Sequence, residues 1–85
     1  MNSDVIKYFR GLLKCDYDIF ENKNTIEILF SKSQSSKKLF ELILFALDKE
    51  QLKYKIIKSN SKTLIFNLIF NDCLYKIIFK RSVIL

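Results

Sequence analysis

The chain has 85 residues, of which 49% are hydrophobic, and this length suits one small domain with a modest core. Fifteen basic and nine acidic residues give a net charge of +6, which favours phosphate groups or other anions as partners. Histidine is absent, which excludes serine–histidine–aspartate and cysteine–histidine catalysis within one chain and removes the commonest metal ligand.

Apolar periodicity and turn residues divide the chain into a series of elements. In chain order the pattern predicts a helix over 4–15, strands over 17–21 and 25–32, a helix over 37–50, and strands over 53–58 and 62–70. Turns are expected at 22–24 and 59–61, because asparagine and serine favour tight turns. Residues 73–81 fit either a helix or a strand, and a capping Asn71 or Asp72 makes a helix the prediction.

These elements predict an α+β fold, with residues 1–85 as a single domain. The expected order is α-β-β-α-β-β-α, with a four-stranded antiparallel sheet and the helices packed on one face. No linker, repeat or low-complexity block divides the chain.

The two cysteines, Cys15 and Cys73, lack the spacing of a metal site and cannot build a disulfide framework. We therefore expect two buried, free thiols in a reducing compartment. Neither a secretory signal nor an apolar run of membrane-spanning length is seen, which predicts an intracellular protein with no membrane partner.

The composition also carries a mutational signature. Lysine, isoleucine, asparagine, phenylalanine and tyrosine make up 43 of the 85 residues, and their codons are AU-rich. This bias indicates an AT-rich genome, such as that of an organelle, a reduced bacterium or a virus. Of these, an organelle, above all the mitochondrion, is the favoured location.

The stretch from Phe9 to Asp16 breaks two local rules. The only glycine of the chain, Gly11, lies inside the first predicted helix, where glycine is about 1 kcal/mol less favourable than alanine. Cys15 follows four residues later on the same face, so the pair would let a second helix approach closely, either from a partner or from the chain itself. Asp16 falls at the helix C-terminus, where the dipole disfavours a carboxylate. Such departures indicate packing or function.

The segment 8–20, with Gly11, Leu12, Leu13 and Asp16 in the motif positions, resembles the LAGLIDADG homing endonuclease family. Residues 25–31, 38–47 and 54–62 are similar to the family's second strand, middle helix and second hairpin, and residues 68–78 are similar to the end of that hairpin entering the closing helix. The resemblance therefore covers most of the chain.

If the family's chemistry persists, the resemblance implies that Asp16 is a catalytic ligand of a divalent metal such as Mg²⁺. A second carboxylate would then come from a homodimer partner or another motif-bearing protein. Two positions depart from the motif, because Lys14 replaces a frequent acidic residue and Tyr17 replaces the glycine that follows the metal-binding aspartate. These departures favour a domain that has lost cleavage and needs no cofactor.

The second predicted hairpin is rich in lysine, and the tip of the first is polar. In the resembling family the sheet face and the hairpin tips lie along the nucleic-acid backbone. The expected nucleic-acid-binding residues are therefore Lys23, Lys53, Lys55, Lys58, Asn60 and Lys62.

The leading hypothesis is a nucleic-acid-binding protein, with RNA favoured over DNA, that resembles a homing endonuclease without its cleavage activity. It would serve as a structural subunit of an organellar ribosome or other ribonucleoprotein, or as a splicing cofactor. One alternative is an active homodimeric endonuclease that cleaves DNA with a divalent metal. Another is a small protein-interaction module, such as a viral inhibitor, whose positive charge is drift.

Overall fold

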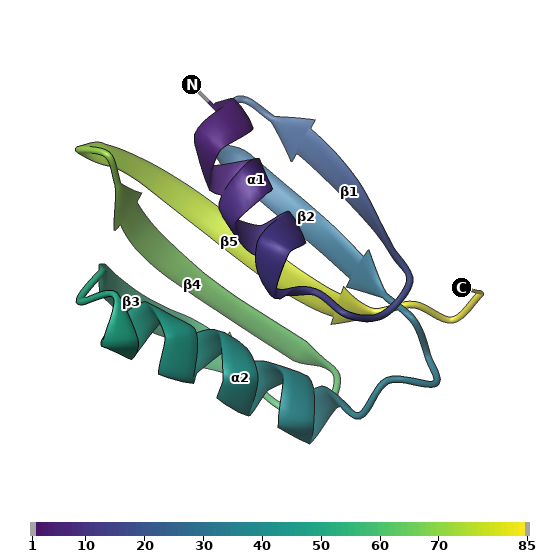
Figure 1. Cartoon of the computed structure of the whole chain (residues 1–85). Helices are drawn as coiled ribbons and strands as arrows, with labels where there is room; N and C mark the ends of the chain where they lie inside the picture. The colour runs from purple at the N-terminus through teal and green to yellow at the C-terminus, as the bar shows by residue number, and fades with distance from the viewer. Residues whose placement is uncertain (1, 85) are drawn as a thin grey trace.

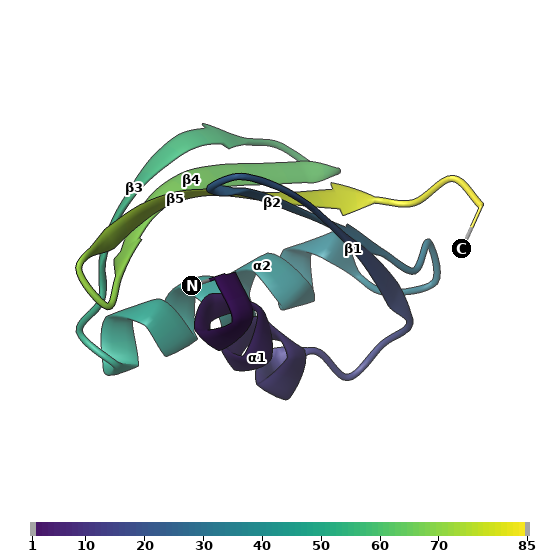
Figure 2. The same cartoon turned by 90° about the horizontal axis from the view of Figure 1, so that it is seen from above.

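The structure is a computed structural model that describes residues 2–84, and it contains two helices and five strands (Figure 1). In chain order these are α1 (Asn2–Leu12), β1 (Tyr17–Asn22), β2 (Thr25–Phe30), α2 (Ser36–Lys49), β3 (Lys53–Ser59), β4 (Thr63–Phe70) and β5 (Cys73–Arg81). Figure 2 shows that both helices lie on one face of the sheet and that the sheet arches over them. The α+β class and the placement of the helices are as predicted.

The predicted four-stranded antiparallel sheet is wrong. The sheet has five strands in the order β1-β2-β5-β4-β3. β2 and β5 pair in parallel, whereas the other three neighbouring pairs are antiparallel. The sheet is therefore mixed, and its central strand is the segment that was predicted to be a closing helix.

That segment, β5, is a strand because it pairs with β2 on one side and with β4 on the other. Asn71 and Asp72, expected as helix caps, have φ angles of 51° and 63°. Positive φ at both central residues is typical of a two-residue hairpin turn, and Phe70 accordingly pairs with Cys73. The side chains buried from β5 then alternate, and they are Tyr75, Ile77 and Phe79.

The first helix is shorter than predicted. It ends at Leu12, so Cys15 and Asp16 lie in the loop before β1 rather than on the helix. Its apolar face points to the sheet, where the buried ring of Phe9 meets those of Phe66 and Phe79 with centroid distances of 6.3 and 5.6 Å. This aromatic group fixes α1 over β4 and β5.

The second helix is close to its predicted bounds. Its N-cap is Ser35, whose hydroxyl accepts a hydrogen bond from the backbone N–H of Lys38 at 3.2 Å. Phe40 meets Phe30 of β2 edge to face at 5.6 Å, which anchors the start of α2 to the sheet. Within residues 2–84, no helix is long and apolar enough to cross a membrane.

The prediction of two buried thiols is wrong for both cysteines. Both are free, but Cys15 is half-buried and Cys73 is exposed. Cys73 is the first residue of β5, directly after the hairpin turn.

Candidate nucleic-acid interface

One face of the sheet carries no helix, and we call it the open face (Figure 2). Side chains alternate along a strand, so the residues between the buried ones of each strand point to this face. On β4 and β5 they are Thr63, Ile65, Asn67, Ile69, Leu74, Lys76, Ile78 and Lys80, and the β3 residues that pair with the outward residues of β4 are Lys53, Lys55 and Lys58. We call this part of the open face the basic half.

The lysines of the basic half form two columns separated by an uncharged strand. On β3 the register shifts between Ile56 and Lys58, so that Ile57 is an extra residue that is 53% exposed. Lysines and a bulge are typical of a protected edge strand, and β3 is an edge of the sheet. The column on β5 was not predicted, because that segment was expected to be helical.

The net charge of the chain lies entirely in this region. Residues 53–81 contain seven basic residues and one acidic residue, whereas residues 1–52 contain eight of each. The single carboxylate, Asp72, lies in the turn between β4 and β5. The basic half therefore presents five ammonium groups with no carboxylate among its outward side chains.

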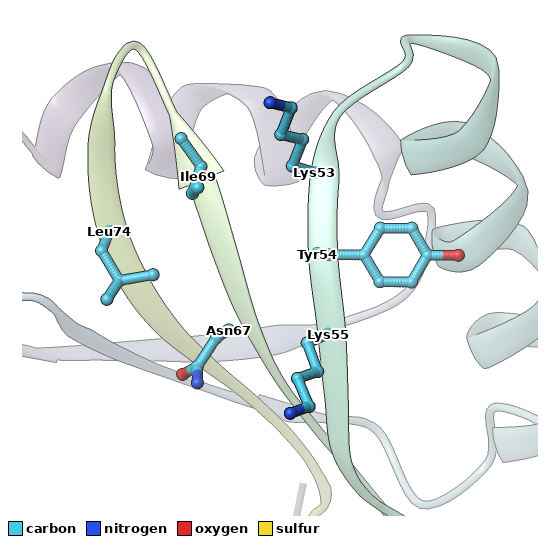
Figure 3. A pocket seen from close by; sticks show the side chains of 6 residues that line it. All are labelled: Lys53, Tyr54, Lys55, Asn67, Ile69 and Leu74. Atoms are coloured by element: carbon cyan, nitrogen blue, oxygen red, sulfur yellow. The ribbon is translucent and has the colours of Figure 1, made fainter.

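At one end of the basic half, two rows of residues that pair across neighbouring strands enclose a shallow pocket (Figure 3). Lys53 pairs across the sheet with Ile69 and then Leu74, and Lys55 pairs with Asn67. The pocket has a volume of about 290 Å³ and is lined by Lys53, Tyr54, Lys55, Asn67, Ile69 and Leu74.

The ring of Tyr54 points away from the pocket and toward α2 (Figure 3). Its hydroxyl donates a hydrogen bond of 2.7 Å to Oδ1 of Asp48. That bond to the Asp48 carboxylate, with burial as a second cause, raises the pKa of Tyr54 above its ordinary value of 10. Tyr54 thus ties the edge strand to the helix layer and offers no ring to the open face.

The two hairpin tips, which were both expected to contact the nucleic-acid backbone, lie at opposite ends of the sheet. The backbone N–H of Lys76 donates to the carbonyl of Asn24 at the first tip, whereas that of Arg81 donates to the carbonyl of Lys62 at the second. Five residues of extended strand separate these contacts, which is about 17 Å. The parallel pairing of β2 with β5 causes this separation, so Lys23 is remote from Asn60 and Lys62.

Asn60 has a structural role in the second tip. Its side-chain Oδ1 accepts hydrogen bonds from the backbone N–H groups of Lys62 and Thr63, at 2.9 and 2.8 Å. Asparagine commonly stabilises a turn in this way. The oxygen is therefore engaged within the tip.

A second basic cluster lies at the same end of the sheet as this tip. Lys32, Lys62 and Arg81 line a shallow surface pocket together with Ser82 and Val83. The guanidinium of Arg81 donates to the carbonyl of Lys32, with Nε at 3.1 Å, and so fixes the loop that follows β2. Arg81 was not predicted as a site residue.

Asp16 is exposed, and its carbonyl accepts a hydrogen bond from the backbone N–H of Ser31 at 2.9 Å. No group of three or more histidine, cysteine, aspartate or glutamate residues gathers anywhere in residues 2–84. Within this described part of the chain, Asp16 is thus not part of such a group, and a carboxylate supplied by a second chain stays a prediction.

Gly11 lies on the exposed side of α1. A Cβ atom built there would meet no atom within 4 Å, so the chain's own second helix does not pack closely against Gly11. Cys15, beyond the end of the helix, packs at the margin of the core. Contact of either residue with a second chain stays a prediction.

We compared the chain with protein-family models, with curated proteins and with solved structures, and no match was found in any of the three comparisons.

Proposed function

We propose that this protein binds nucleic acid by contacting the sugar–phosphate backbone with the basic half of its open face. One observation carries the proposal. The whole net charge of +6 lies in residues 53–81, and five of the lysines there extend from β3 and β5 onto the one sheet face that has no helix over it.

Binding of this kind depends on charge rather than on stacking. A lysine ammonium on a flexible stem neutralises a phosphate and releases condensed counterions, which makes the affinity fall steeply with salt. The outward side chains of β3, β4 and β5 include no aromatic ring that could hold a base by stacking. A subunit of an organellar ribosome or other ribonucleoprotein, the setting that the sequence favours, would use such a face against RNA phosphates.

The test is a pair of variants with equal net charge. The first replaces the five open-face lysines by glutamine, at Lys53, Lys55, Lys58, Lys76 and Lys80. The control replaces five exposed lysines on or beside the helices, at Lys7, Lys14, Lys37, Lys38 and Lys49.

The affinity for RNA and DNA is then measured by fluorescence anisotropy over a range of salt concentrations. For the open-face variant we expect a weaker affinity and a salt dependence flattened by about 0.7–0.9 in slope for each phosphate that is no longer neutralised. The control should keep the slope of the original protein. Equal weakening of both variants would show that total charge, not this face, governs binding, and would contradict the proposal.

A second candidate function, docking of a protein partner, is favoured by the helix layer. Leu42 and Phe45 of α2 are 42% and 66% exposed, and they line a groove together with Tyr8 and Leu12 of α1. Large apolar side chains gathered on a surface often mark an interaction site. This surface lies on the other side of the molecule from the basic half, so the lysine variants distinguish the two functions.

A further inference from the structure

The pocket at the end of the basic half combines groups that suit a nucleotide. Ile69 and Leu74 form apolar walls that are 43% and 58% exposed, and two lysines on β3 lie beside them. Figure 3 shows that these side chains come from three neighbouring strands. The site is preformed by the sheet itself and needs no loop to close.

Asn67 is the unusual residue of this pocket. It interrupts an outward column of β4 that otherwise consists of Thr63, Ile65 and Ile69. Asparagine is depleted in strands because its side chain competes for backbone hydrogen bonds. Within residues 2–84, no hydrogen bond of its side-chain amide is found. A half-buried amide with an unused donor and acceptor therefore faces the pocket.

We propose, building on the proposed function, that this pocket receives one base of a single-stranded nucleic acid. Ile69 and Leu74 cover the flat surface of the base, and the amide of Asn67 bonds its edge. The donor and acceptor of an asparagine amide match N6 and N7 of adenine, so adenine is the best fit. Lys53 and Lys55, about 6.6 Å apart along the strand, hold the phosphates on either side.

The shape of the face favours a single strand over a duplex. The sheet arches over the helices, so its open face is convex (Figure 2). A duplex is itself convex and keeps its bases stacked inside, so it would touch this face along a narrow line. It would also place phosphates against the isoleucine side chains between the lysine columns. A single strand can turn its bases onto the apolar strip and its phosphates toward the lysines.

The experiment compares three ligands of one length: single-stranded oligoadenylate, an abasic strand with the same phosphates, and an adenine–uracil duplex. Affinity is measured by fluorescence anisotropy at one salt concentration and again at a higher one. Oligoadenylate should bind about tenfold more tightly than either of the other ligands, because only its bases can both cover the apolar walls and bond Asn67.

Two variants locate the effect. Asn67→Ala should reduce the preference for oligoadenylate over the abasic strand by about three- to tenfold, the range expected for one or two hydrogen bonds. The matched control is Asn22→Ala, because Asn22 lies in the same row of the sheet at its far edge, reached from Asn67 through Lys76 and Thr25. The control should leave the preference unchanged.

The outcomes separate this inference from the proposed function. If all three ligands bind equally and with a steep salt dependence, the base pocket is refuted and phosphate binding stands. If none binds in a salt-dependent way, both proposals fall. If Asn67→Ala and Asn22→Ala behave alike, Asn67 does not contact a base.

Discussion

The basic half of the open face and the part formed by β1 and β2 have the same architecture and opposite chemistry. In both parts, successive side chains of a strand point alternately to the shared core and to the open face. Both parts also end in an edge strand. On β1 and β2, however, the outward charged residues are the carboxylates Asp18 and Glu27. The two parts of the open face therefore differ in the sign of their outward charges.

The difference does not come from the number of lysines. Residues 1–52 contain seven lysines and residues 53–85 contain six, so lysine is spread along the chain as AU-rich codons would spread it. The carboxylates are distributed unevenly, with eight in the first part and one in the second. Codon bias therefore accounts for the abundance of lysine but not for the missing carboxylates of the basic half.

A substitution in the core that both surfaces share should have the largest effect on stability. Phe9→Ala removes a fully buried ring that contacts β4 and β5, and such truncations destabilise a protein by about 3–5 kcal/mol. A domain of this size has little stability to lose, so the whole sheet should unfold in one transition.

Urea unfolding followed by circular dichroism measures this effect. Phe45→Ala is the control, because its side chain is 66% exposed, and we expect a change within about 0.5 kcal/mol. A second transition in the Phe9 variant would mean that the two parts of the sheet fold separately.

Replacing Glu27 by lysine should extend the positive charge of the basic half onto β2. Glu27 of β2 pairs with Ile78 of β5, and its row lies between those of Lys76 and Lys80. Glu27→Lys should therefore tighten nucleic-acid binding and steepen its salt dependence by about 0.7–0.9 in slope. Glu41→Lys on α2 makes the same change of charge away from the sheet. If both substitutions strengthen binding equally, the position of the charge is irrelevant.

A smaller effect is expected at the residue that first indicated a helix contact. Gly11 lies in α1, and nothing is within 4 Å of the position of a Cβ atom. Gly11→Ala should raise the stability by up to about 1 kcal/mol, because alanine favours the helix more than glycine does. Thermal unfolding of the isolated protein tests this. A marked loss of stability would instead indicate a close contact at Gly11.

The sequence predicts most of the fold, because α2 and the first four strands each have one clear period and recognisable turns. It fails at residues 73–81, where Leu74, Ile77 and Ile78 satisfy a helical spacing and Tyr75, Ile77 and Phe79 satisfy an alternating one. Only the pairing of this segment with β2 and β4 decides between the two. Tertiary contacts of this kind are not encoded in a local pattern.

The same failure limits the prediction of the site. Lys53 and Lys55 do lie on one face of the sheet, as alternation along β3 suggests. Lys58 lies on the same face only because the register shifts at Ile57, and the role of the three lysines in binding stays a prediction. Lys76 and Lys80 were missed because their strand was expected to be a helix. Lys23 was grouped with the second hairpin because nothing in the sequence reveals that β2 and β5 run parallel.

The smallest effect concerns how each edge strand is held to the helices. Tyr54 of β3 donates its hydroxyl to Asp48, whereas the ring of Tyr17 in β1 lies 5.8 Å from the guanidinium carbon of Arg10. Tyr54→Phe removes a partly exposed hydrogen bond, so stability should fall by about 0.5–1 kcal/mol near pH 7. Tyr17→Phe keeps the ring and its contact with Arg10, and it serves as the control, with little change expected.

The contribution of the Tyr54 hydroxyl to stability should decrease at high pH. The pKa of Tyr54 is raised in the folded protein, chiefly by the hydrogen bond to Asp48 and then by burial, so folding favours the neutral phenol. The contribution is complete below pH 10, the ordinary pKa of tyrosine, and is lost as the pH rises through the folded-state value. Burial also raises the pKa of Tyr8 and Tyr75, but both residues are present in the original protein and in the variant and cancel in the difference. The stability gap between the original protein and Tyr54→Phe should therefore narrow above pH 10, as measured by urea unfolding at several pH values. A gap that stays constant across this range would mean that Asp48 does not hold the Tyr54 hydroxyl, and that the edge strand of the basic half is fixed by packing alone.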